Sequence, residues 1–188
     1  MEDITNLTGK FLCALPGMGD HRFEKSVIFI CAHNSDGAMG LIVNKPKGDL
    51  LVHELLEQAG IEGTSRHGDT PVLDGGPVDI DRGFVLHTAD YYNADSSLRI
   101  SETLALTSTR DVLEAMTTSK TPDMAILAVG YAGWGGGQLE REIADNAWMV
   151  INAKESLIFE FELEGKWAKA LAAIGITPDM LSHFGGSA

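Results

Sequence analysis

The most apolar stretch of this chain is MAILAVGY, which runs from Met124 to Tyr131. A continuous apolar run of this length is typical of a strand buried on both faces, so it predicts a central strand of a sheet. The glycine cluster GWGGG follows closely, and the residues from Gln138 to about Asn146 have the pattern of a helix. A strand, a glycine turn and a helix start are also the framework of a phosphate-binding site. This segment therefore bears on both the fold and the function.

The glycine cluster does not match the known phosphate-binding motifs. When the dinucleotide pattern G-x-G-x-x-G is started at Gly133, its last position falls on Gln138. Neither Gly-Lys pair of the chain is followed by Ser or Thr, as a P-loop requires. Glu140 and Glu142, early in the helix, would repel a phosphate. We therefore interpret the glycines as a turn that lets strand and helix pack closely beside Trp134.

Strand-like and helix-like segments are unevenly distributed along the chain. Strands are expected at residues 10–15, where a Pro-Gly turn follows, and at 26–33, 38–44, 84–87, 98–100, 104–107 and 147–151. Further helices are expected at 50–60, 107–119 and 164–175. The connection Asn-Ser-Asp-Gly between the second and third strands suits a hairpin. Hairpins at the start and helices inserted later predict an α+β fold with a mixed sheet, in a single domain spanning residues 1–188.

The charge balance restricts the partners that such a chain can bind. Lys and Arg number 14 against 27 Asp and Glu, which gives a formal net charge of -13. Nucleic acids and anionic membranes are bound mainly through basic residues, so we expect neither partner. The closest approaches to a basic patch are the pair Lys45 and Lys47 and the pair Lys166 and Lys169, which we interpret as solvated surface.

The sequence favours a cytoplasmic location. The N-terminal segment MEDITNLTGK has no apolar core of a secretory signal, and the longest apolar runs are too short to span a membrane. Cys13 and Cys31 both lie in strand-like segments, without the dense pattern of a secreted disulfide scaffold. Reduced, buried thiols are the expected state of both cysteines.

Motifs for catalysis and metal binding are incomplete. The segment VHELLEQ resembles a zinc-protease helix, but Glu57 stands where the second histidine is needed, so His53 and Glu57 could offer only a partial site. Cys31 and His33 share one face of a predicted strand, yet a buried cysteine is usually a small apolar residue. No Gly-x-Ser-x-Gly motif occurs. We expect no metal and no cofactor, and we favour a protein without enzymatic activity.

The three tryptophans, Trp134, Trp148 and Trp167, have no basic residues interleaved with them. We interpret them as core or interface anchors and not as platforms on which bases stack.

Four stretches in this order and spacing resemble the AlgH/YqgE family of bacterial proteins, which are described as uncharacterised or as transcriptional regulators. They are residues 9–46, 72–88 and 128–150 and the FGGSA tail at 184–188. The resemblance implies strongly bent, bifurcated β-sheets flanked by helices. It implies no established catalytic residue or cofactor.

The family's recurring polar positions correspond to a set that we take as the candidate binding cleft: Asp20, His33, Asn44, His87, Gln138, Glu140 and Asn146. Polar groups near turns and strand ends often line clefts, although they can also tie down turns or cap helices.

Three functional hypotheses remain open at this stage. We favour a regulator that acts through unknown protein partners and does not read DNA directly, and a homo-oligomer is left open. The alternative is an enzyme or ligand-binding protein, which requires His33 or His87 within hydrogen-bonding reach of Asp20 or Glu140. Direct control through DNA has the family's description in its favour and the charge against it.

Overall fold

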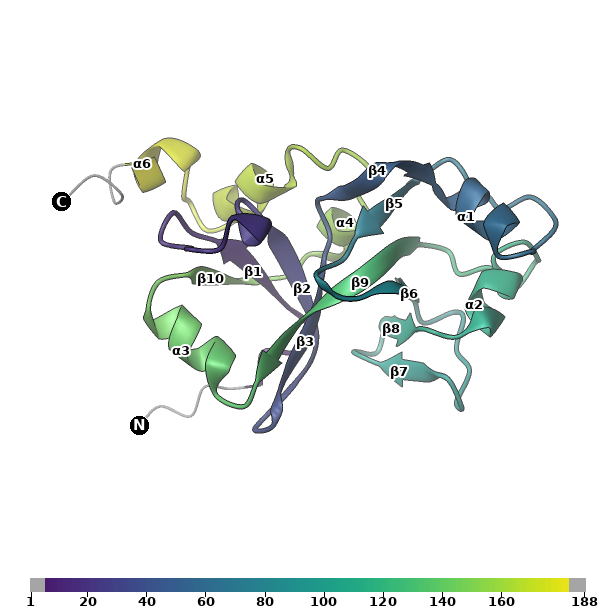
Figure 1. Ribbon diagram of the computed structural model, residues 1–188, viewed down its shortest axis with the longest axis horizontal. Coiled ribbons are helices and arrows are strands. Elements are labelled where there is room, and N and C mark those ends of the chain that lie inside the picture. Colours follow the sequence, from purple (N-terminus) through teal and green to yellow (C-terminus); the bar gives the residue numbers. More distant parts are fainter. Residues whose placement is uncertain (1–5, 183–188) are drawn as a thin grey trace. The chain divides into compact units, whose positions relative to one another are not determined.

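The computed structural model describes residues 6–182, which divide into two compact units (Figure 1). The first unit contains the chain up to Asn44 and from Ala132 onward, and the second unit contains Lys45–Tyr131. The FGGSA tail and the first five residues of the N-terminal segment lie outside the described residues.

The first unit is built on an antiparallel sheet. Its strand order is β10 (Trp148–Asn152), β1 (Lys10–Ala14), β2 (Val27–Asn34), β3 (Gly37–Ile42) and the end of β9 (Ala125–Gly135). The β2–β3 hairpin is the one expected from Asn-Ser-Asp-Gly, and its register shifts between Ile30 and Ala32.

Helices pack on both faces of this sheet. Alternate residues of β1, Leu12 and Ala14, cluster with Leu139 of α3 (Gln138–Ala144). The residue between them in pleat, Phe11, faces Ala170 of α5 (Lys166–Ala172) instead. Because both faces are covered, β1 and β2 are almost continuously apolar. The remaining helices of this unit are η1 (His21–Phe23), α4 (Glu155–Ile158) and α6 (Pro178–Ser182).

The second unit has a mixed sheet. The first part of β9 pairs in parallel with β5 (Pro71–Asp74) and antiparallel with β6 (Val78–Thr88). The sheet continues from β6 to β8 (Leu104–Thr107) and β7 (Ser97–Arg99), while β4 (Pro46–Leu51) pairs with β5. Helices α1 (Val52–Gln58) and α2 (Arg110–Ala115) bury Val52, Leu56, Val112 and Met116 in a core with Val72, Val85 and Leu127.

The α+β class with bent, mixed sheets and flanking helices is confirmed. The expected strands and helices all occur, and the run from Met124 is indeed the strand β9, which is shared by both sheets. Strands β4 and β5 and the short helices η1, α4 and α6 were not expected. That residues 1–188 form a single domain stays a prediction.

The glycines around β9 permit close approach of backbone segments. Strand β9 continues to Gly135, so the turn before α3 consists of Gly136 and Gly137. A Cβ atom at Gly136 would lie 2.7 Å from the carbonyl oxygen of Ser35, in the turn between β2 and β3. The glycine turn therefore packs against the hairpin, as well as joining β9 to α3.

One expectation about the surface is wrong. Lys166, interpreted from the sequence as solvated, is fully buried. The prediction for the aromatic residues holds for Trp134 and Trp148, which are 7% and 2% exposed, while Trp167 is half-buried.

Candidate functional site

The structure brings together two of the predicted polar residues, His33 and Glu140. They are 107 positions apart in the sequence, on β2 and in the first turn of α3. The imidazole Nε2 atom lies 2.6 Å from the Glu140 Oε1 atom. The His33 side chain is 5% exposed and the Glu140 side chain 28%, so the pair lies at the edge of the core of the first unit.

The hydrogen bonds of His33 fix its tautomer. The backbone N–H of Leu7 donates to Nδ1 at 2.9 Å, so this nitrogen accepts and carries no proton. The proton of the neutral ring is then on Nε2, which donates it to the Glu140 carboxylate. The backbone N–H of Glu140 and the bond from His33 hold the pKa of this carboxyl below its ordinary value. With both nitrogens occupied, the imidazole holds Leu7 and α3 in place.

Asp20 and Asn44 each stabilise a turn. The Asp20 carboxylate accepts from the Arg22 backbone N–H at 3.0 Å and pairs with the Arg22 guanidinium at 2.7 Å, which lowers its pKa. Asn44 accepts from the Val27 backbone N–H and donates to the Lys25 carbonyl, both at 2.9 Å. Lys25 has a φ of 53°, so Asn44 secures a left-handed residue at the start of β2.

Gln138 and Asn146 stabilise the two ends of α3. The Gln138 Oε1 atom accepts from the Gly135 backbone N–H at 3.0 Å. Asn146 has a φ of 60° beyond the helix end, and its backbone N–H donates to the Ile143 carbonyl at 3.1 Å. Asparagine tolerates this left-handed conformation better than most residues, which explains its place there.

His87 belongs to the second unit and is completely buried. Its Nδ1 atom lies 2.9 Å from the Thr88 carbonyl oxygen and its Nε2 atom 2.8 Å from the Thr107 hydroxyl. Burial lowers the pKa of His87, so the neutral ring joins β6 to β8. That these seven residues line one binding cleft stays a prediction. Within the first unit the structure joins His33 to Glu140, with Gln138 in the same first turn of α3, and places Asp20, Asn44 and Asn146 at other turns.

The cysteines and the metal-binding residue types within residues 6–182 are the alternative candidates for a site. Cys13 and Cys31 are free and buried, as expected, and burial raises the pKa of each thiol to about 12. A thiol with so high a pKa is almost fully protonated near neutral pH and is a poor nucleophile. Across residues 6–182, no group of three or more His, Cys, Asp or Glu side chains is arranged to hold a metal ion.

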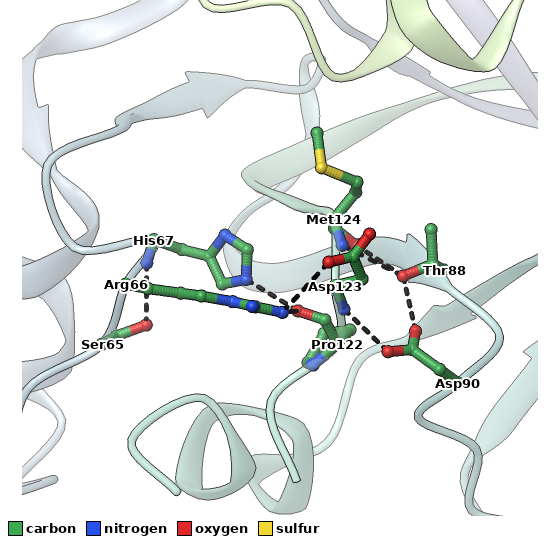
Figure 2. A network of polar contacts seen from close by, with 8 residues as sticks. All are labelled: Ser65, Arg66, His67, Thr88, Asp90, Pro122, Asp123 and Met124. Atoms are coloured by element: carbon green, nitrogen blue, oxygen red, sulfur yellow. Dashed lines mark hydrogen bonds and ion pairs between the residues drawn. The ribbon is translucent and has the colours of Figure 1, made fainter. Parts of the chain in front are cut away.

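A polar network joins three loops of the second unit (Figure 2). His67 and Arg66 reach the Pro122 carbonyl oxygen at 2.8 and 2.9 Å. The Asp90 carboxylate accepts from the Asp123 backbone N–H at 2.8 Å and from the Thr88 hydroxyl at 2.5 Å. These contacts hold the chain before β9 against the loop after β6.

Next to this network, the second unit has a hollow of about 620 Å³. Its lining includes three carboxylates and two tyrosines: Asp90, Asp111, Glu114, Tyr91 and Tyr92. This cluster could not be predicted from the sequence, because its members come from the loop after β6 and from α2, with no diagnostic spacing.

Two carboxylates of this hollow, Asp90 and Asp111, remain charged at neutral pH. Burial acts to raise the pKa of Asp111, but donors from Thr109, Tyr91, Ser96 and Asn93 outweigh it and leave the pKa below its ordinary value. The pKa of Asp90 is lowered in the same way, with the Thr88 hydroxyl and backbone N–H groups overcoming burial. The hollow, which we call the acidic hollow, therefore holds the ionised carboxylates Asp90 and Asp111, with Lys120 as the one basic residue among the described residues of its lining.

Comparison with known proteins identifies the family. A family model described as AlgH-like matches residues 11–179. The chain belongs to the AlgH-like family. A UPF0301 protein of Caulobacter vibrioides is 49% identical over 188 residues, covering 100% of this chain and 96% of that protein. The UPF0301 protein SPO0296 of Ruegeria pomeroyi is 50% identical over 184 residues, covering 97% of this chain and 100% of that protein.

Solved structures share the AlgH-like fold. The solution structure of AlgH from Pseudomonas aeruginosa has a TM-score of 0.79 and 37% identity, covering 100% of this chain and 99% of that one. The crystal structure of protein DIP2367 from Corynebacterium diphtheriae has a TM-score of 0.74 at 21% identity, covering 100% of this chain and 95% of that one, and it supports the fold alone. No helix of the described residues is long and apolar enough to cross a membrane.

Proposed function

We propose that this AlgH-like protein is a regulator that acts by binding a protein partner, and that the acidic hollow receives a basic side chain of that partner. The observation that carries the proposal is the hollow itself: three carboxylates and two aromatic rings line about 620 Å³ of space, and two of these carboxylates, Asp90 and Asp111, are ionised without a salt bridge to Lys or Arg within residues 6–182. Glu114 pairs with Arg110, and Lys120 is the one basic residue in the described part of the lining. Carboxylates and aromatic faces together attract a lysine or arginine side chain, by charge and by cation–π contact.

Exposed side chains beside the hollow have the composition of a protein interface. Tyr92, on its rim, is 42% exposed, and the Arg99 guanidinium lies 4.6 Å from the centre of its ring. Leu98, adjacent to Arg99 on β7, is 46% exposed. Tyrosine and arginine are enriched among the residues that contribute most to protein–protein binding. We therefore place the partner over Tyr92, Leu98 and Arg99.

The arginines support a protein partner in preference to DNA. Most of them already contact an acidic or aromatic side chain: Arg22 with Asp20, Arg66 with Asp123, Arg110 with Glu114, Arg82 with Phe84 and Arg99 with Tyr92. Binding to DNA phosphates would have to compete with these contacts in a protein of net charge -13. A role in transcription would accordingly be exerted through the protein partner. We place this role in the cytoplasm, because free cysteines such as Cys13 and Cys31 are typical of that compartment.

Photo-crosslinking in living cells tests the proposal. The residue p-benzoylphenylalanine replaces Tyr92 in one form of the protein and Ile174, an exposed residue of the first unit, in the control form. The Tyr92 form should give a discrete crosslinked protein, and the Ile174 form should not. The second change Glu114→Lys should remove that crosslink by charge reversal, whereas Glu57→Lys on the exposed face of α1 should preserve it.

Two results would contradict the proposal. The first is a crosslink that is equally strong from both positions or that survives Glu114→Lys. The second is tight binding of a labelled DNA duplex, measured by fluorescence anisotropy, that weakens steeply as salt is added, because this is the behaviour of a protein that neutralises phosphates.

A further inference from the structure

The first unit has a separate hollow of about 590 Å³ beside its sheet. Its walls come from β1, the end of β10, α4 and α5, so it is formed by segments far apart in the sequence. The volume falls within the range of about 300–1,000 Å³ that is typical of small-molecule sites. This hollow is independent of the partner-binding surface proposed above.

The floor of the hollow is apolar. Phe11 and Ile151 contribute buried side chains from the sheet, and Ala170 and Ala173 contribute small side chains from α5 and its C-terminus. Leu157 of α4 completes this surface. Ala170 is buried where α5 faces the sheet, and Ala173 lies at the exposed edge of the hollow, so small side chains at both positions leave space that larger residues would fill.

The rim of the hollow is basic, which is unusual in so acidic a protein. Lys154, which precedes α4, and Lys169 of α5 both line it. Lys10 donates a hydrogen bond to Asn152, which is another lining residue. Lys169 pairs with Glu160, another lining residue, which leaves the net charge of the lining to Lys154. Within residues 6–182 the Lys154 ammonium forms no ion pair or hydrogen bond, so it is available to a ligand.

We infer that this hollow binds a small amphipathic anion, whose apolar chain lies on Phe11, Ile151 and the α5 alanines and whose acidic head group contacts Lys154. A ligand of this kind accounts for both the apolar floor and the basic rim of the hollow. An apolar floor alone would accept a neutral ligand, and basic residues alone would accept any small anion. An amphipathic carboxylate gains from burial of its chain and from pairing of its head group in the same position.

Isothermal titration with decanoate tests the inference, with acetate and decyltrimethylammonium as ligands that lack the chain or carry the opposite charge. Decanoate should bind with a Kd of about 0.1–1 mM, the range expected for a ligand of its size. Acetate and decyltrimethylammonium should bind at least about tenfold more weakly. The change Ala173→Trp should abolish decanoate binding by filling the hollow, and its exposed position keeps the fold intact.

Lysine variants test the head-group contact. Lys154→Gln should weaken decanoate binding about fivefold, as expected for the loss of one exposed charge contact. Lys120→Gln, an exposed lysine of the second unit, should leave the Kd unchanged. Equal binding of all three ligands, or decanoate binding that survives Ala173→Trp, would overturn the inference. Binding to anionic lipid vesicles in place of monomeric decanoate would also overturn it, because the source of the head group would then be a membrane.

Discussion

Lys166 is the residue whose surroundings differ most from what its type suggests. Its side chain is fully buried, and its Nζ atom donates to the carbonyl oxygens of Val43 at 2.9 Å and Ile158 at 2.8 Å. The contacts join the end of β3 to α4. Burial lowers the pKa of Lys166 from 10.5 to about 8. A neutral amine has two N–H bonds, which match the two carbonyl acceptors, so the uncharged form fits this site well.

This lowered pKa should make the stability of the protein depend on pH. Between about pH 8 and pH 10.5 the unfolded chain keeps the proton on Lys166 while the folded protein loses it. The free energy of unfolding should therefore increase with pH across this window, and the contribution is at most about 3 kcal/mol. Below about pH 8 the cost of burying the charge is present in full. Urea unfolding at several pH values from about 7.5 to 10 measures the slope.

Comparison of two variants isolates the contribution of Lys166. The change Lys166→Met should remove the upward slope, although it also lowers stability at every pH because two buried carbonyl groups lose their donor. Lys154→Met, at an exposed lysine of the same unit, should keep the slope of the original protein. A Lys166→Met protein with an unchanged slope would show that other groups cause the pH dependence.

The contacts of individual side chains could be predicted only in part from the sequence. The family resemblance selected His33 and Glu140, but only the fold brings them together, since they are 107 positions apart. Lys166 was misjudged because a lysine in a short amphipathic helix usually extends into solvent. Its partners are backbone carbonyls, which carry no signal in the sequence. The acidic hollow was missed for a related reason, because hydrogen bonds from hydroxyl groups in separate loops define it.

At the scale of elements, hydrophobic patterns predicted the long buried strands, whereas the exposed strand β4 was missed. Strands β1, β2 and β9 are apolar because helices or sheets cover both of their faces. Strand β4, with the sequence PKGDLL, is mostly exposed and contains proline and glycine, so nothing in its composition favours a strand. Helices α4 and α6 span 4 and 5 residues, too few for a helical period to be recognised.

Strand β9 depends on one glycine within the second unit. Gly130 has a φ of 78°, and a Cβ atom there would lie 2.3 Å from the carbonyl oxygen of Gly76. The change Gly130→Ala should therefore combine backbone strain with a clash against backbone, and it should lower the free energy of unfolding by more than about 2 kcal/mol. Chemical denaturation followed by circular dichroism measures the loss.

Gly48, in the same unit, provides the matched control. Its φ is 57°, but nothing lies within 4 Å of the position that a Cβ atom would take. Gly48→Ala should cost about 1 kcal/mol, which is the strain of the left-handed conformation alone. If the two variants lost equal stability, the contact with Gly76 would contribute nothing and the clash would be relieved by a small shift.

At the scale of the whole molecule, the excess of acidic residues is the dominant electrostatic feature. The acidic side chains of a protein with a net charge of -13 repel one another, and this repulsion destabilises the folded state. Attraction within a few ion pairs acts in the opposite direction: Arg22–Asp20, Arg66–Asp123 and Arg110–Glu114. These pairs are well exposed, and surface pairs as a class contribute little to stability. Repulsion therefore outweighs local pairing, and screening of charge should stabilise the protein.

Salt should consequently raise the melting temperature at neutral pH. The Debye length falls from about 30 Å at 0.01 M to about 8 Å at 0.15 M, which screens distant like charges more than adjacent opposite ones. Differential scanning fluorimetry at about pH 7.5 should show a Tm several degrees higher in the more concentrated sodium chloride. Near the isoelectric point of 4.7 the same addition should change Tm little, because the net charge is close to zero. A Tm that falls with salt at neutral pH would mean that the specific ion pairs, and not the net charge, control the electrostatic stability of this protein.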